Sequence, residues 1–456
     1  MSFYFPPYQT IGTIRVGKLA KFLIAQGWEI RVLSAQHTTA PDLPLEIPEE
    51  LIVRTPWTNI DRMFSRRALF SLFRSSAAKP IPNPTADPTA PQPTEAPHDF
   101  DAGFSGRLRR RLHKLFFTLV HWPDRQIGWL PHAIQAGDRL LAEWRPDVIL
   151  ASSPPPTTLL AADLLARRHD LPWIADFRDP WVDNPYYEHP RWRLWVERAW
   201  EKSVVGRCSG IVSVSPVVRD QFAAKFNTPS VLAMNGFDPA DYPDADYPDA
   251  DRPDGAARPN SADDRLRLVF TGHIYSGYSD PTILFQALRD MGAEGKQVHV
   301  EFYGTCGDAV TPLAQALGVA ASVTVHPPVS HRQALAIQMG ADALLSLQWI
   351  NPKEISRIAA KLFEYLGARR PILAIGCATG PAVDLLTSRN AGFVCDNAAD
   401  VARRLRDWLA QKRDGGILPL PASATVGLTR VEQFSHIERL MERVVQARRE
   451  ASIERG

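Results

Sequence analysis

Two groups of charged side chains could bind a polar substrate, and the first lies in a predicted helix at residues 357–368. Lys361 and Glu364 are three residues apart in it, so both face the same side of the helix. A lysine supplies positive charge for an anion, and a carboxylate can accept hydrogen bonds from two adjacent hydroxyl groups. On spacing alone, however, an ordinary Lys–Glu surface pair, stabilising by about 0.2–0.5 kcal/mol, explains the two residues better.

The second group is a charged triplet at the end of a predicted strand. Asp176, Arg178 and Asp179 lie within four residues, between apolar Ile174 and Trp181. Because parallel strands present their carboxyl ends to ligands, we expect this triplet to face a substrate. A buried structural Arg–Asp pair is the main alternative.

Alternating strands and helices must position both groups. Short apolar β-rich runs alternate with helical patterns, which is typical of parallel α/β sheets. The predicted strands are 29–35, 148–152, 173–177 and 211–215, then 266–271, 298–303, 322–326, 343–347, 371–375 and 392–395. The predicted helices include 14–26 and 157–169, then 280–291, 332–339, 357–368, 382–388 and 400–410, and a last packing helix at about 426–448.

A chain of 456 residues exceeds the usual size of one domain, so two cores are expected. We predict an N-terminal Rossmann-like domain at 1–238, a flexible Pro/Asp-rich linker at 239–264 and a C-terminal Rossmann-like domain at 265–425, followed by a helix and tail at 426–456. The Pro/Thr/Ala-rich residues 79–98 are predicted to be a disordered insert. Both domains would be doubly wound α/β sheets.

Composition limits the partners and the compartment. The chain has 52 basic and 50 acidic residues and a net charge of +2, which gives no whole-chain case for nucleic-acid binding. Its four cysteines stand apart, as expected of reduced thiols in a cytoplasmic protein, and no metal-ligand cluster is apparent. We found neither a signal peptide nor a membrane-spanning run.

The first predicted strand is unusually short, because only residues 2–5 precede the Pro6-Pro7 loop. A four-residue remnant of a central strand would leave its neighbours unpaired. We therefore expect the initiator methionine to lie several residues upstream of Met1.

Several phrases, in order along the chain, resemble glycosyltransferase family 4, especially bacterial members that act on surface polysaccharides. They are YFPP (4–7) with Gly12 and Arg15, PDRQIGW (123–129), SSPPP (152–156), DFRDPW (176–181), NGFD (235–238), FTGHIY (270–275), KLFEYL (361–366) and RPIL (370–373). The resemblance implies a GT-B fold, in which two Rossmann-like domains face a central cleft. It also implies metal-independent transfer from a nucleotide sugar, with retention of configuration and no cofactor.

The resemblance assigns roles to individual residues on the donor side. Glu364 matches the glutamate that binds the ribose hydroxyls, and Lys361 would bind the diphosphate. The remaining predicted donor-binding residues are Gly12, Arg15, Gly272, His273, Val329 and Ala360. Helix N-termini and basic side chains would hold the diphosphate in place of a metal.

The sequence departs from the family in two places. Many members carry a second glutamate eight positions before the one that matches Glu364, but Ser356 stands there, with Glu354 two residues earlier. Relatives also often have an arginine and a lysine in the loop that corresponds to 272–279, which here has neither. His273 could substitute as a donor, and a plain polar turn is an equally good interpretation.

On the acceptor side, the resemblance suggests that Asp176 and Asp179 orient the acceptor hydroxyl and that Arg178 lies near the sugar or phosphate. Residues 106–122 combine five basic residues with an apolar face at helical spacing, which is typical of a helix on an anionic membrane. A core helix with solvated arginines explains the pattern slightly better. If the membrane interpretation holds, the protein is peripheral on the inner face of the cytoplasmic membrane and its acceptor is lipid-linked.

Three other functions remain open. A GT-B-type sugar-nucleotide epimerase would need carboxylates on both sides of the donor, and we see no clear cluster of this kind. A nicotinamide-dependent oxidoreductase is weakly supported, since no G-x-G-x-x-G follows a strand. A non-catalytic member of a polysaccharide assembly complex would account for the altered donor motifs.

Overall fold

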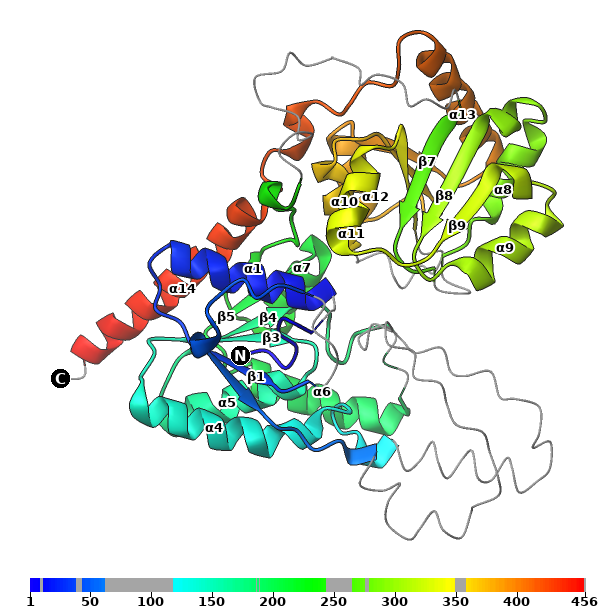
Figure 1. Ribbon diagram of the computed structural model, residues 1–456. Helices are drawn as coiled ribbons and strands as arrows, with labels where there is room; N and C mark the ends of the chain where they lie inside the picture. The colour runs from blue at the N-terminus through cyan, green and yellow to red at the C-terminus, as the bar shows by residue number, and fades with distance from the viewer. Residues whose placement is uncertain are drawn as a thin grey trace, which may run out of the picture. The chain divides into compact units, whose positions relative to one another are not determined.

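The structure, a computed structural model, describes residues 1–8, 11–37, 43–61, 118–185, 187, 189–242, 265–274, 279–348 and 358–454. It divides into two compact units (Figure 1). The N-terminal unit comprises residues 1–214, 218–233 and 434–456, and the C-terminal unit comprises 215–217 and 234–433. The chain thus returns to the N-terminal unit near residue 434, within the helix and tail predicted at 426–456.

A parallel sheet forms the centre of the N-terminal unit. Its strands are β3 (Ile149–Ser153), β4 (Trp173–Phe177), β5 (Gly210–Ser213) and β6 (Ser230–Leu232), in that order. A second parallel pair consists of β1 (Val32–Ala35) and β2 (Ile52–Thr55). The first residues of the chain lie between β1 and β3. Ser2 N–H donates to Leu33 O at 3.1 Å, and Ser152 N–H donates to Met1 O at 3.0 Å. These residues therefore connect β1 to β3.

Helices pack on both sides of this sheet. They are α1 (Ile11–Ala25), α4 (Leu130–Glu143), α5 (Thr157–His169), α6 (Arg191–Val205), α7 (Pro216–Phe226) and α14 (Arg430–Ile453). The predicted helix at 426–448 corresponds to α14. Its Phe434, Ile437 and Leu440 are buried against Leu19 of α1 and Ile174 of β4.

The C-terminal unit has six parallel strands in the order β12-β11-β10-β7-β8-β9. Their bounds are β7 (Leu266–Thr271), β8 (Val298–Tyr303), β9 (Val323–His326), β10 (Ala343–Leu347), β11 (Ile372–Ile375) and β12 (Gly392–Cys395). The direction in which successive strands are added reverses between β7 and β10. In such open sheets the carboxyl ends of the strands at this switch point are where ligands bind.

Two sets of helices cover the two faces of this sheet. Helices α8 (Thr282–Asp290), α9 (Gly307–Ala316) and α13 (Ala398–Arg413) share one apolar core with it. Helices α10 (His331–Met339), α11 (Ala360–Gly367) and α12 (Pro381–Ser388) share the other. The prediction of doubly wound α/β architecture is confirmed, and α11 begins at Ala360, three residues later than expected.

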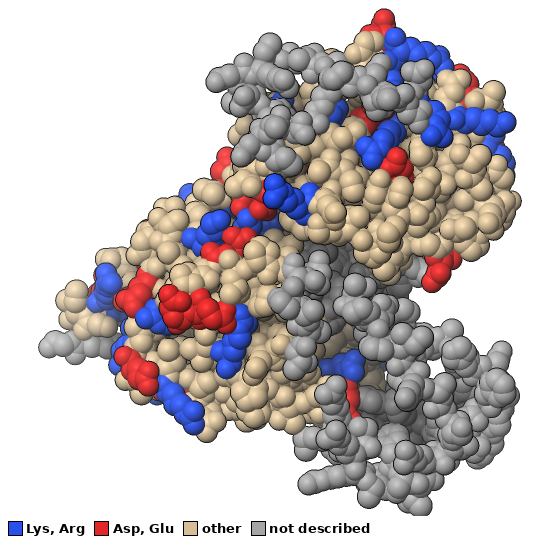
Figure 2. Space-filling model, in the orientation of Figure 1, with Lys and Arg blue, Asp and Glu red and all other residues tan. Residues whose placement is uncertain are grey.

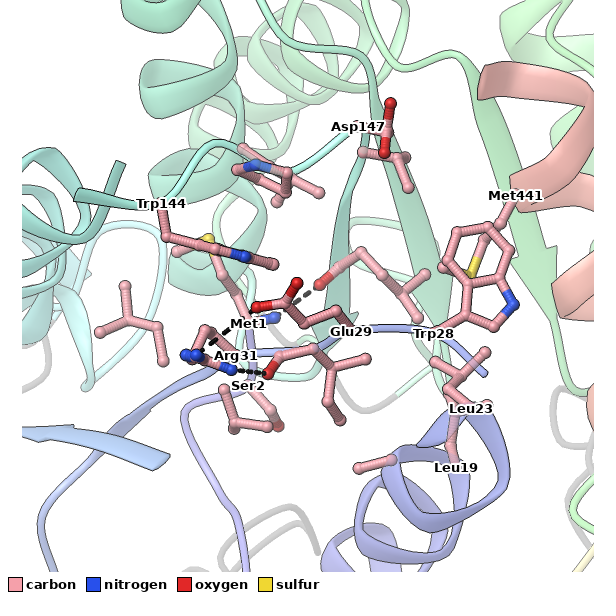
Figure 3. Close-up of a pocket in the computed structure, with 18 of the residues that line it drawn as sticks. Met1, Ser2, Leu19, Leu23, Trp28, Glu29, Arg31, Trp144, Asp147 and Met441 are labelled. Atoms are coloured by element: carbon pink, nitrogen blue, oxygen red, sulfur yellow. Dashed lines mark hydrogen bonds and ion pairs between the residues drawn. The ribbon is translucent and has the colours of Figure 1, made fainter. Parts of the chain in front are cut away.

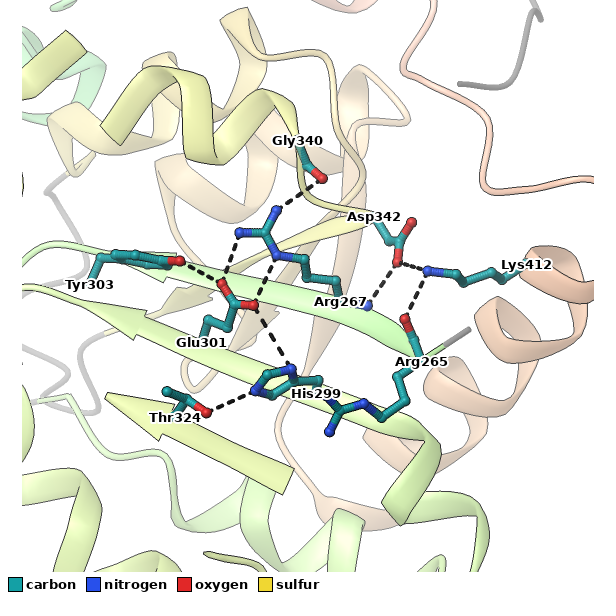
Figure 4. Close-up of polar contacts among 9 residues, drawn as sticks. All are labelled: Arg265, Arg267, His299, Glu301, Tyr303, Thr324, Gly340, Asp342 and Lys412. Atoms are coloured by element: carbon teal, nitrogen blue, oxygen red, sulfur yellow. Dashed lines mark hydrogen bonds and ion pairs between the residues drawn. The ribbon is translucent and has the colours of Figure 1, made fainter. Parts of the chain in front are cut away.

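A polar network ties the strands of the C-terminal unit together (Figure 4). Arg267 on β7 donates to both carboxylate oxygens of Glu301 on β8, from Nε at 3.0 Å and from Nη2 at 2.8 Å. The Tyr303 hydroxyl donates to the same carboxylate at 2.7 Å. At the start of β7, Lys412 of α13 donates to Asp342 at 2.6 Å. These buried and half-buried pairs hold the sheet that positions the residues described below.

Surface charge is of mixed sign on the face shown in Figure 2. Arginines gather along α13, where Arg403, Arg404 and Arg406 pair with Asp400, Asp407 and Glu294. The positive charge along this helix is therefore largely compensated locally. None of the helices that the structure describes is long and apolar enough to cross a membrane.

Candidate functional site

The loops after β7 and β8 approach each other closely through glycines. Gly272 has φ +122° and donates its N–H to Tyr303 O at 2.8 Å. Gly304 has φ +130°, and a Cβ there would overlap the Gly272 carbonyl. Only glycine adopts such backbone angles at low cost, so both positions require it. The two glycines therefore lie where the chain segments after β7 and β8 meet.

Lys361 lies in the first turn of α11, beside this loop. Its Nζ is 3.8 Å from the centroid of the Phe270 ring and 3.6 Å from the place that a Cβ on residue 272 would occupy. Burial lowers the pKa of Lys361 to about 8. The side chain is therefore still mostly protonated at neutral pH, and it presents a positive charge next to the N-terminus of the helix.

Glu364 follows one turn later on the same helix, and two side chains of α10 contact it. His331 Nε2 is 3.1 Å from Oε1, and Gln338 Nε2 is 3.5 Å from Oε2. The Glu364 side chain remains 20% exposed, so a ligand can reach the carboxylate. Burial alone would raise its pKa, but the hydrogen bond and charge of His331, with Arg430 and Gln338, outweigh it and lower the pKa below the ordinary value.

Buried hydrogen bonds fix α11 against the sheet. The Tyr365 hydroxyl accepts from the Thr271 N–H at 2.9 Å, and Gln338 donates to the Thr271 hydroxyl at 2.9 Å. Tyr242 donates to the Glu364 carbonyl at 2.8 Å. The backbone that carries Lys361 and Glu364 is thus held at several points, which reduces the conformational freedom that a ligand must otherwise remove.

Two further predicted residues flank this group. His273 is exposed, and its Nδ1 contacts the Thr305 hydroxyl. Val329 is half-buried and precedes Ser330, which caps α10 together with Gln333 in a capping box. The structure therefore gathers Gly272, Lys361 and Glu364 around α11 and the end of β7.

Arg15 and Asp176 form a buried pair in the N-terminal unit. Arg15 Nη2 is 3.2 Å from Asp176 Oδ1, and the side chains are 1% and 0% exposed. Ser152 donates to the other carboxylate oxygen at 2.8 Å, and Arg15 also donates to Ala233 O at 3.0 Å. For Asp176 this favours the alternative of a structural Arg–Asp pair, with Arg15 rather than Arg178 as its partner. Direct substrate contact by Arg15 or Asp176 has no support from this arrangement.

Arg178 and Asp179 follow β4 and are half-buried. Arg178 donates from Nη2 to Pro154 O at 2.6 Å and from Nε to Ser153 O at 3.3 Å. Its guanidinium lies against Gly12, where a Cβ would overlap it. These contacts bring Arg178 and Gly12 together at the start of α1, and they leave Arg178 and Asp179 more accessible than Asp176.

Sequence analysis missed His331 and Gln338 as partners of Glu364. His331 is 33 residues from Glu364, so no spacing rule connects them. The only local sign is the Ser330–Gln333 capping box, which marks the start of α10 but not its neighbour. Ser356, Glu354 and residues 106–117 lie outside the described residues, as does most of the predicted linker.

A cavity of about 520 Å³ in the N-terminal unit contains none of the predicted site residues (Figure 3). Trp144 and Trp28 lie on opposite sides of it, with Glu29 and Arg31 between them, and Met441 of α14 completes one wall. Within the described part of the chain, no three or more His, Cys, Asp or Glu side chains group as metal ligands.

The fold defines a class of protein. Two parallel α/β units of this kind are the fold of GT-B glycosyltransferases. The comparison with a known family agrees. Residues 12–236 match the model of a family described as a glycosyl transferase 4-like domain, which confirms the resemblance found in the sequence.

A solved structure shows the same fold over nearly the whole chain. A sucrose-phosphate synthase from Thermosynechococcus elongatus is similar over 97% of this chain and 94% of its own, at 14% identity and a TM-score of 0.57. A glycosyltransferase from Rickettsia africae ESF-5 is similar over 69% of this chain and 81% of its own, at 13% identity and a TM-score of 0.49. No curated protein matched the sequence.

Proposed function

We propose that this protein is a metal-independent, retaining glycosyltransferase that moves a sugar from a nucleoside-diphosphate sugar to a lipid-linked or polysaccharide acceptor. The observation that carries the proposal is the placement of Lys361 and Glu364 on α11, beside the Gly272 loop at the switch point of the second sheet. The glycosyl transferase 4-like match and the GT-B fold support a transferase.

Each group has a role in donor binding. The Gly272 backbone and the Lys361 ammonium would hold the diphosphate, replacing the charge that a metal would otherwise supply. Glu364 would accept hydrogen bonds from both ribose hydroxyls, since a carboxylate has about four lone-pair positions and two are engaged by His331 and Gln338. His273 and the backbone near Val329 would contact phosphate and base.

The transfer needs no protein nucleophile. The bond between the anomeric carbon and the leaving phosphate oxygen breaks, and a bond to the acceptor oxygen forms on the same face. The acceptor proton passes to the leaving phosphate oxygen. The protein contributes orientation and electrostatic stabilisation of the developing positive sugar and negative diphosphate. Arg178 and Asp179, which remain half-buried, are the proposed acceptor-side residues.

A donor screen with one variant tests this function. We expect one or more UDP- or GDP-sugars to raise the thermal stability of the protein, because a ligand stabilises the state that binds it. Glu364→Ala should weaken calorimetric affinity for that donor about tenfold or more, consistent with two charge-assisted hydrogen bonds, while altering turnover of bound donor much less.

The outcomes separate the alternatives. Full nucleotide affinity in Glu364→Ala would refute the ribose role. Product that forms equally well without any acceptor would favour the epimerase, and no turnover of any bound donor would favour a binding protein.

We also propose that residues 106–122 contact an anionic membrane, because the sequence combines Arg107, Arg109, Arg110, Arg111 and Lys114 with apolar residues at helical spacing. Neutralising these five charges should abolish flotation with anionic liposomes. Flotation that is unchanged in the neutralised variant would contradict the contact.

A further inference from the structure

The carboxylate of Glu364 is held from the neighbouring helix. His331 is the first residue of α10, and Gln338 lies two turns further along the same helix. One contacts Oε1 at 3.1 Å and the other Oε2 at 3.5 Å, so each carboxylate oxygen has its own donor. His331 and Glu364 are 25% and 20% exposed, which places the pair at the border of the accessible surface.

We propose that His331 is a positioning residue that holds the Glu364 carboxylate ionised and correctly oriented for a nucleotide ribose. The proposal rests on the function given above, and it adds a dependence of nucleotide affinity on pH. His331 itself touches no ribose atom in this scheme. It acts through Glu364, and Gln338 supplies a second, uncharged hydrogen bond.

The reason is that burial favours the protonated form of Glu364, whereas the charge of His331 favours the ionised form. A half-buried carboxylate tends to take up a proton, and a protonated carboxyl group can no longer accept from two hydroxyls at once. A cationic imidazole at hydrogen-bond distance opposes this tendency. Gln338 orients the carboxylate but supplies no charge, so it cannot replace His331 in this respect.

Other charges act on the pair, and at His331 two of them act in opposite directions. Asp241, next to Tyr242, favours the protonated form of His331, whereas Arg430 at the start of α14 disfavours it. Arg430 also favours the ionised form of Glu364. Lys361 lies on the same helix as Glu364, one turn before it. The hydrogen bond between His331 and Glu364 involves none of these three residues.

The direction in which pH changes the nucleotide affinity follows from the pKa shifts of His331 and Glu364. Burial would lower the pKa of His331, but its bond to Glu364 raises it above the ordinary value, while the pKa of Glu364 is lowered. The ion pair therefore exists from below pH 4.5 to above pH 6.5. Without His331, Glu364 would lose the largest contribution that opposes the effect of burial on its pKa, so acid loss of nucleotide affinity would begin at a higher pH.

The test is calorimetric titration of the full-length protein with UDP and with GDP between pH 5 and pH 8. The variants are His331→Ala, His331→Gln and Glu364→Ala, with His436→Gln as a matched control, because His436 is a half-buried histidine on α14 that contacts Arg439 instead of Glu364. The terminal phosphate of the nucleotide titrates equally in every variant, so differences between variants report on the side chains.

We expect His331→Ala to weaken binding about tenfold at pH 7.5 and about a hundredfold at pH 5.5, as expected for loss of a charge-assisted hydrogen bond and its effect on ionisation. His331→Gln should recover most of the affinity at pH 7.5, because the amide still donates. At pH 5.5 this variant should still lose more nucleotide affinity than at pH 7.5, because the amide has no charge to keep Glu364 ionised. A purely structural role of His331 would not produce this separation.

The outcomes distinguish failure of the inference from failure of the function. If both His331 variants keep the wild-type pH profile while Glu364→Ala loses binding, the inference is overturned and the proposed function stands. If the wild-type protein binds no nucleoside diphosphate, both are overturned. Thermal melting of each variant checks folding, and should His331→Ala be unfolded, the pH profile of His331→Gln decides the question alone.

Discussion

In the proposed donor site, Gly272 would set how closely the diphosphate can approach Lys361. Its φ of +122° is costly for any residue with a side chain, and a Cβ would lie 3.6 Å from the Lys361 Nζ. Gly272→Ala should therefore lower the free energy of unfolding by about 1–3 kcal/mol and also weaken nucleotide binding. Urea unfolding and calorimetry measure the two effects.

Gly292 provides the control for that variant. It also has positive φ, +59°, but a Cβ there meets nothing within 4 Å. Gly292→Ala should cost roughly 1–2 kcal/mol and leave the nucleotide affinity unchanged. Equal affinities in the two variants would show that the Gly272 loop takes no part in binding.

At single residues, the sequence revealed pairs that are close along the chain and missed pairs that the fold creates. Spacing placed Lys361 and Glu364 on one face of a helix, and the resemblance to a family, rather than the spacing, assigned them a role. The partner of Asp176 is Arg15, 161 residues away, and the partner of Glu364 is His331. Such partners depend on how helices cross the sheet, which residue spacing does not encode.

Among the elements, the PDRQIGW phrase has a structural explanation. Asp124 accepts hydrogen bonds from the Thr157 N–H at 2.7 Å and from the Thr157 hydroxyl at 2.8 Å, at the first turn of α5. Its carboxylate thus satisfies a backbone donor that the helix leaves unpaired, as a capping side chain does. Burial raises its pKa to about 6, so this cap carries less negative charge than an exposed aspartate.

Removing the cap should cost stability. Asp124→Ala is expected to lower the free energy of unfolding by about 1–2 kcal/mol, the usual loss for a helix cap. Asp138→Ala is the comparison, because Asp138 makes only partly exposed pairs with Arg168 and His169 and should cost at most about 1 kcal/mol. A loss at Asp124 no larger than that at Asp138 would contradict the capping role.

Strands were predicted from the sequence better than helices. β4, β7, β8, β10 and β12 have the predicted bounds, since buried parallel strands are short apolar runs. Helix α6 was missed because its buried face is polar. Arg193 Nε forms an ion pair with Glu197 Oε1 at 2.7 Å, and both side chains are 0% exposed. Glu201 is buried one turn further along the helix. A buried ion pair of this kind removes the apolar periodicity on which helix prediction depends.

At the scale of the whole molecule, the sequence did not predict where the chain passes from one unit to the other. The apolar spacing of the last helix predicted that it packs, but not that it packs on the first sheet. Val431 lies at helical spacing from the apolar residues Phe434 and Ile437, yet it is 58% exposed. The buried apolar face of α14 begins at Phe434, where the chain re-enters the N-terminal unit. The predicted linker at 239–264 begins a few residues after the passage at 233–234, and the sequence predicted no linker at 433–434.

This return makes the stability of the N-terminal unit depend on residues at the far end of the chain. Leu440 is 1% exposed and packs against Gly210 of β5, where a Cβ would lie 3.0 Å from its methyl groups. Leu440→Ala should lower the free energy of unfolding of the N-terminal unit by about 2–5 kcal/mol, whereas Val431→Ala should change it by at most about 0.5 kcal/mol.

A saturating nucleotide should protect the C-terminal unit in both variants, because its proposed site lies entirely within residues 234–433. Calorimetric melting with and without nucleotide resolves these effects, and equal melting of the two variants would show that α14 does not stabilise the first sheet.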